Sequence, residues 1–101
     1  MARHTESMDR VAEAILETPG DAALELRHAV EAFAAGRAVD LPDDLQPYVE
    51  KVTRNAYKVT DADVDRLRDA GYSDDAIFEL TLAAALGAAR ARLDAGLRAM
   101  G

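Results

Sequence analysis

A chain of 101 residues is long enough for one domain, since domains commonly hold about 100 to 200 residues, so we expect residues 1–101 to form a single unit. The sequence contains no cysteine, which excludes disulfides, thiolate nucleophiles, iron–sulfur ligation and thiol redox chemistry. The formal net charge is -7 and the acidic residues are spread along the chain, so we expect neither nucleic acid nor an anionic membrane surface as a partner, because both bind clustered Lys and Arg.

The first predicted helix follows a flexible end at residues 1–6. From Ser7 onward, apolar residues recur at the spacing of one helix face, and Thr18-Pro19-Gly20 stops the pattern. The apolar face consists of Met8, Val11, Ala12, Ile15 and Leu16.

The second predicted helix begins at Asp21, whose carboxylate is suited to accept hydrogen bonds from the amides of the first turn. Gly36 is placed to end the helix in a left-handed conformation. Its apolar stripe consists of Ala22, Leu26, Ala29, Val30 and Phe33. A second stripe of Leu24, His28 and Ala32 lies on the opposite side, and it is either a solvated face or a subunit contact.

The third predicted helix starts near Asp44 and extends to about Tyr57. The sequence Leu41-Pro42-Asp43-Asp44 is typical of a helix start, because proline is tolerated in the first turn and acidic residues favour the helix dipole there. One face contains Leu45, Tyr48, Val49, Val52, Ala56 and Val59. We therefore expect Ala56 and Val59 to be packed in the core.

Two strong start signals predict a short fourth helix and a long fifth one. Thr60 and Asp63 have the spacing of a capping box, and Gly71 stops the fourth helix. Ser73 is the predicted N-cap of the fifth helix, with Asp74 and Asp75 in its first turn. Together these patterns predict an all-α fold of about five helices.

The fifth helix is alanine-rich and carries two adjacent apolar stripes. One stripe is Ile77, Leu80, Ala84, Ala88 and Ala91, and the other is Phe78, Leu82, Leu86, Ala89 and Leu93. Because both faces need a partner, we expect contacts on both sides of this helix. Gly87 in its middle predicts the close approach of a neighbouring helix, since a mid-helix glycine costs about 1 kcal/mol relative to alanine.

The segment Gly71 to Leu80 (GYSDDAIFEL), followed by Leu82 to Leu86 (LAAAL), resembles the helix pair of the alkylhydroperoxidase D-like / carboxymuconolactone decarboxylase-like family. The resemblance covers roughly Leu41 to Met100. It implies an alkylhydroperoxidase D-like helical bundle that assembles into trimers or hexamers.

The peroxidase branch of that family carries a C-x-x-C-x-x-x-H motif before the glycine and a glutamate further upstream. The same spacing places Ala56 and Val59 at the cysteine positions and Asp63 at the histidine position of this chain, with Asp44 corresponding to the glutamate. All three redox groups are absent. We therefore reject thiol peroxidase activity.

Four polar residues near the expected helix contacts are the candidates for acid/base chemistry: Asp44, Tyr57, Asp63 and Glu79. Three of them also have a structural interpretation. Asp63 completes a cap, Glu79 faces water and Tyr57 closes a helix end. His4 and His28 lack the spacing of metal ligands, so we expect neither a metal nor a cofactor.

Two classes of function follow. The first is a non-redox, non-catalytic oligomer that acts through protein–protein contact, and the second is a cysteine-independent acid/base enzyme of decarboxylase or lactone type acting on a small organic molecule. A closed core around Ala56, Val59 and Asp63 would remove the site of the enzyme, whereas a cavity lined by Tyr57 or Asp63 would support it. No apolar run reaches the roughly 18 residues that span a bilayer, so we expect a cytoplasmic protein.

Overall fold

Five α-helices make up most of the computed structural model, which describes the backbone of residues 2–101 and the side chains from residue 6 onward. They are α1 (Ala2–Leu16), α2 (Leu24–Ala34), α3 (Gln46–Asn55), α4 (Asp61–Asp69) and α5 (Asp74–Met100), with a short 3-10 helix, η1 (Ala56–Lys58), between α3 and α4. Residues 2–101 contain no strand. The predicted all-α class of about five helices is confirmed.

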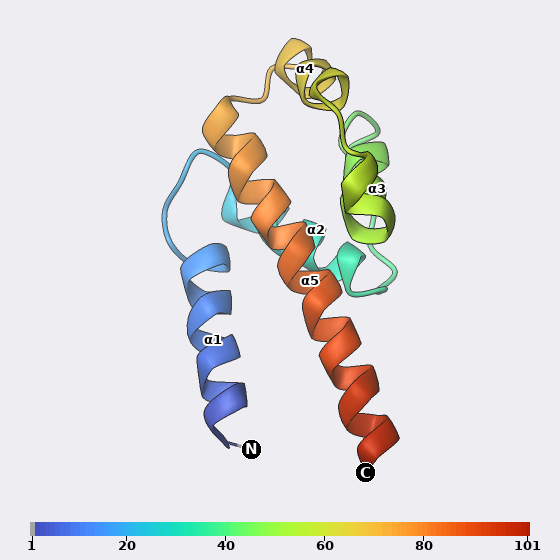
Figure 1. Cartoon of the computed structure of the whole chain (residues 1–101). Helices are drawn as coiled ribbons and strands as arrows, with labels where there is room; N and C mark the ends of the chain where they lie inside the picture. Colours follow the sequence, from blue (N-terminus) through green and yellow to red (C-terminus); the bar gives the residue numbers. More distant parts are fainter. Residues whose placement is uncertain (1) are drawn as a thin grey trace.

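Helix α5 is the axis of the fold. It runs diagonally in front of α2, with α1 on one side, α3 on the other and α4 near its N-terminal end (Figure 1). Its most extensive contacts are with α2. The C-terminal turns extend beyond α2 and α3, only α1 reaches about as far, and residues 92–101 are exposed. The molecule is therefore elongated, with extents of 45 × 27 × 23 Å.

The core is built from small and medium-sized side chains around the contact between α2 and α5. Its fully buried members are Val30, Leu45, Val49, Ala83 and Ala84. At Gly87, an added Cβ atom would lie 2.9 Å from the Cβ atom of Ala34 and would overlap the carbonyl oxygen of Glu31. The predicted close approach at Gly87 is confirmed, and the neighbouring helix is α2.

The predicted caps of α4 and α5 are also confirmed. Thr60 and Asp63 form a capping box, in which the backbone N–H of Thr60 donates to Oδ2 of Asp63 at 2.8 Å. Oγ of Ser73 accepts from the backbone N–H of Ala76 at 3.0 Å. Gly71 ends α4 with a φ of 104°, in the left-handed region that a side chain disfavours.

Gly36 has a φ of 92° just after α2, as predicted for a helix stop. The start of α2 differs from the prediction, because the helix begins at Leu24 and Asp21 makes no cap. Helix α1 begins at Ala2, within the segment expected to be flexible, since no glycine or proline interrupts the chain there. Met1 lies outside the described residues.

The prediction that Ala56 is packed in the core is wrong. Helix α3 ends at Asn55, and the change to the 3-10 conformation of η1 turns Ala56 away from the buried face that Val49 occupies. Val59 is partly buried against the core. The helical spacing of apolar residues thus continues beyond the end of the helix itself, and Tyr57 belongs to η1.

Candidate functional site

Two of the four predicted site residues, Asp44 and Asp63, meet at one cavity. This α3–α4 cavity has a volume of about 410 Å3. Its lining combines the buried side chains of Tyr48, Asp63 and Leu67 with exposed charged side chains. The full lining consists of Asp43, Asp44, Pro47, Tyr48, Lys51, Asp63, Arg66 and Leu67.

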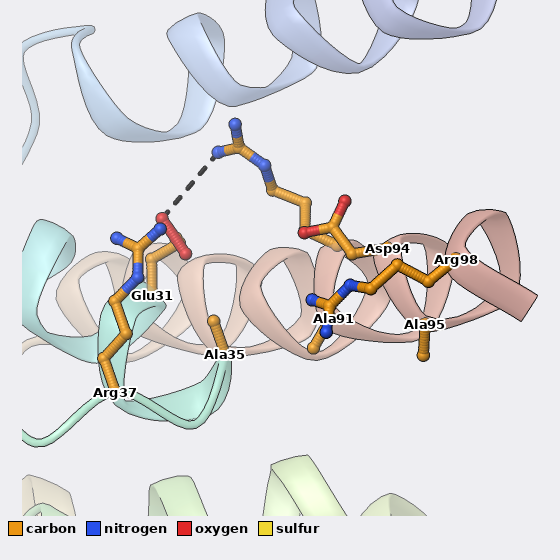
Figure 2. Close-up of a pocket in the computed structure, with 8 residues that line it drawn as sticks. Glu31, Ala35, Arg37, Ala91, Asp94, Ala95 and Arg98 are labelled. Atoms are coloured by element: carbon orange, nitrogen blue, oxygen red, sulfur yellow. Dashed lines mark ion pairs between the residues drawn. The ribbon is translucent and has the colours of Figure 1, made fainter. Parts of the chain in front are cut away.

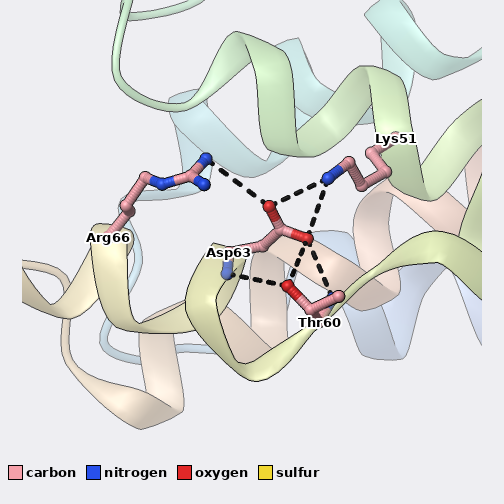
Figure 3. Close-up of polar contacts among 4 residues, drawn as sticks. All are labelled: Lys51, Thr60, Asp63 and Arg66. Atoms are coloured by element: carbon pink, nitrogen blue, oxygen red, sulfur yellow. Dashed lines mark hydrogen bonds and ion pairs between the residues drawn. The ribbon is translucent and has the colours of Figure 1, made fainter.

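Asp63 is held by an almost complete set of donors (Figure 3). Nζ of Lys51 donates to both carboxylate oxygens at 2.9 Å, and the backbone N–H and the hydroxyl of Thr60 donate to Oδ2. Nη1 of Arg66 lies 3.5 Å from Oδ1. Asp63 is only 6% exposed. The side chain therefore completes the predicted cap and also anchors α4 to α3.

These contacts lower the pKa of Asp63 to about 2, chiefly through the hydrogen bond from Lys51 and then through the backbone N–H of Thr60. A carboxylate with this pKa stays ionised at neutral pH. It is a weak general base, since the most effective base has a pKa near the working pH. The sequence does not predict the role of Lys51, because nothing in the local pattern links it to a residue 12 positions away.

Asp44 is tied to the connection before α5. Its Oδ1 accepts a hydrogen bond from the hydroxyl of Tyr72 at 2.9 Å. Burial, followed by the hydrogen bond to Asp44, raises the pKa of Tyr72 to about 12, so the phenol remains a donor at neutral pH. Tyr48 is engaged in the same way, because its hydroxyl lies 2.8 Å from Oγ1 of Thr81 on α5. The polar groups of this cavity thus join helices to each other.

Tyr57 and Glu79 lie away from this cavity. Tyr57 is 82% exposed, and Nζ of Lys58 lies 5.8 Å from the centre of its ring. Glu79 accepts hydrogen bonds from the backbone N–H groups of Asp21, at 3.1 Å, and Ala22, at 2.8 Å. The bond from Ala22 is the main cause that lowers the pKa of Glu79 below its usual value.

The interpretation that Glu79 only faces water is therefore wrong, because its carboxylate holds the turn that leads into α2. Gly20 leaves room for it, since a Cβ atom there would lie 2.7 Å from Cδ of Glu79. Asp21, the predicted cap, instead accepts a hydrogen bond from the hydroxyl of Ser73 at 3.0 Å.

A second cavity, of about 600 Å3, lies beside the C-terminal end of α2 and the C-terminal half of α5. The side chains of Arg37 and Arg98 line it, together with Glu31 and Asp94 (Figure 2). Nη1 of Arg90 lies 3.7 Å from Oε1 of Glu31. Charges of both signs alternate here, and the carbonyl end of α2 disfavours an anion. The lining thus favours no single class of ligand.

The most unusual surface is the side of α5 opposite α2, here called the α5 outer face and defined by Phe78, Leu82, Ala85, Ala89 and Leu93. All five side chains are exposed, and Phe78 is 63% exposed. They recur at helical spacing, and no charged residue interrupts the face between Phe78 and Ala89. The exposed face of a helix normally carries polar residues.

The α5 outer face differs from the predicted second stripe of apolar residues at one position. The sequence pattern assigns Leu86 to it, but Leu86 is only 5% exposed and packs in the core. Ala85 takes its place on the surface. Further along the helix, Leu97 and Met100 are exposed, and Arg92 at the edge of the face donates to the carbonyl oxygen of Thr53 at 3.3 Å.

The stripe of Leu24, His28 and Ala32 on α2 differs from the α5 outer face in its polarity. Nε2 of His28 lies 2.7 Å from Oε1 of Glu17, and both side chains are about half exposed. In the described part of the chain, no three His, Asp or Glu side chains gather as metal ligands would. No helix among residues 2–101 has the length and apolar character needed to cross a membrane.

Comparison of the chain with protein-family models, curated proteins and solved structures finds no significant match. The resemblance to the alkylhydroperoxidase D-like family therefore stays a prediction.

Proposed function

We propose that this protein is a non-catalytic, self-associating helical protein that works through protein–protein contact at the α5 outer face. The observation that carries the proposal is the uninterrupted apolar surface from Phe78 to Ala89 on the solvent side of the central helix. A protein with a net charge of -7 has many polar residues available, yet none of them occupies this face.

Energetics support the same conclusion. Burying a fully exposed large apolar side chain contributes about 1.5–3 kcal/mol, so a side chain that is already partly covered contributes less. Large exposed apolar patches commonly mark interaction sites. Phe78, Leu82 and Leu93 are the large side chains of the face, and the alanines between them would let a partner helix approach closely. The family resemblance implies trimers or hexamers, so it too predicts that copies of the chain associate.

The enzyme alternative draws its support from the α3–α4 cavity, where Asp44 and Asp63 lie together. Its weakness is chemical, because the carboxylate of Asp63 is neutralised by Lys51 and its low pKa makes it a poor base. We therefore propose the α5 outer face as the functional site and assign the residues of the cavity a role in stabilising the fold.

Sedimentation equilibrium of the Phe78→Asp variant tests the proposal. An unpaired carboxylate buried in an apolar contact costs more than about 1.4 kcal/mol, so we expect self-association to weaken at least tenfold. Tyr57→Asp is the matched control, since it places the same charge at an exposed aromatic position on η1 and should leave association unchanged. Equal dissociation constants for the two variants and the unmodified chain would refute the role of this face.

A further inference from the structure

We infer that the partner of the α5 outer face is the α5 outer face of a second copy, packed antiparallel about a twofold axis near Ala85 and Ala89. In this arrangement Leu82 of each copy lies beside Leu93 of the other. The inference rests on the proposed function, because it names the partner and its orientation for that same surface.

The order of large and small side chains along the face supports a helix pair. Ala85 and Ala89 stand in the middle, with Leu82 and Phe78 towards the N-terminus and Leu93 towards the C-terminus. Small residues at a crossing point let two helix axes approach to about 8 Å, the lower end of the usual range. Large side chains on both sides of the crossing then close the contact. Such a self-complementary patch suits the isologous interface of a twofold dimer.

Charge decides between the antiparallel and the parallel arrangement. The end of the molecule formed by α4 and the start of α5, residues 61–75, contains six aspartates and two arginines and has a net charge of -4. The C-terminal turns of α5, residues 90–98, contain three arginines and one aspartate and have a net charge of +2. Antiparallel packing brings the basic end of one copy to the acidic end of the other, whereas parallel packing would bring like charges together. The dipoles of the two helices favour the same orientation.

The position of α1 agrees with this geometry. Leu82 and Leu93 are each a little more than one-third exposed, and each borders a hollow between α1 and α5. Neither α1 nor α3 crosses in front of α5 (Figure 1). A second α5 could therefore lie along the whole face and cover the exposed parts of both leucines.

The absence of cysteine allows a direct test by disulfide cross-linking. Leu82→Cys and Leu93→Cys are prepared as separate proteins, one with a mass tag, then mixed and mildly oxidised. The two positions are 11 residues apart, about 16 Å along a helix, and a disulfide needs Cβ atoms within about 3.5–4.5 Å. We expect the mixed disulfide between residues 82 and 93 to form well over half of all disulfides, the share that random pairing of equal amounts of the two variants would give.

The other outcomes separate the two proposals. Homodisulfides in excess would show parallel packing, and statistical proportions would show random collision; either result overturns the antiparallel pairing. Light scattering on the unmodified chain and on the reduced variants measures association independently of cross-linking. A dimeric mass without the mixed disulfide leaves the proposed function standing and refutes the orientation, whereas a monomeric mass for the unmodified chain refutes both.

Discussion

The α3–α4 cavity and the α5 outer face differ in how far their side chains are already engaged by other residues of the chain. At the cavity, Asp63 receives hydrogen bonds from Lys51 and Thr60, and Asp44 receives one from Tyr72, so the charged and polar groups already have partners. On the outer face, Phe78 is 63% exposed, and Leu82 and Leu93 are only partly covered by α1. The charged residues of the α3–α4 cavity thus stabilise the fold, whereas the apolar α5 outer face is the surface that we expect to bind another molecule.

The largest expected effect contrasts the two sides of α5. Gly87→Leu places a side chain against the backbone of Glu31 and against Ala34. Overpacking a core typically costs about 1–3 kcal/mol, and we expect at least this loss of stability here. Ala89→Leu adds similar volume on the outer face and should leave the stability of the monomer nearly unchanged. Chemical denaturation of both variants, at a concentration low enough to keep the chain monomeric, measures the difference. An unchanged midpoint for Gly87→Leu would show that the helix contact is loose.

Glu79→Ala tests the long-range contact that fixes the start of α2. The change leaves the backbone N–H groups of Asp21 and Ala22 without their carboxylate, which should cost about 0.5–1.5 kcal/mol for each hydrogen bond lost. Self-association should not change, since the carboxylate points away from the outer face towards Gly20. Thermal unfolding together with light scattering checks both parts, and a variant as stable as the parent would contradict the assigned role.

The pH dependence of stability tests the role of Asp63 in the cavity. Its folded-state pKa of about 2 lies below the ordinary value of 3.8, so the ionised carboxylate stabilises the fold above about pH 4. This contribution should be lost as the pH falls from about 4 to about 2. Asp63→Asn should flatten the dependence of melting temperature on pH in that range. A parallel profile for both proteins would mean that the contact with Lys51 does not stabilise the fold.

The features that are predictable from the sequence are those set by neighbours in the chain. The Thr60–Asp63 box, the Ser73 cap and the stop at Gly71 each depend on residues within one or two helical turns. The pattern of apolar residues on α5 likewise shows that two sides of the helix need contacts. These signals suffice to predict the all-α class and to identify α5 as the central helix.

The features that escape the sequence depend on distant residues or on a change of helix type. Glu79 binds backbone groups 57 and 58 positions away, so it replaces Asp21 as the group that holds the start of α2. Ala56 keeps the helical spacing of α3 but lies in η1, where it is exposed. The pattern assigns Leu86 to the wrong side because the two stripes of α5 adjoin each other, and only the position of α1 and α2 separates them.

Light scattering of the unmodified chain at micromolar concentration tests the central claim most directly. If the α5 outer face is an interface between copies, the measured mass should be at least twice the 10.9 kDa of one chain and should fall on dilution. A constant mass of 10.9 kDa across the concentration range would contradict the account, because the face from Phe78 to Leu93 would then be stable while exposed to water.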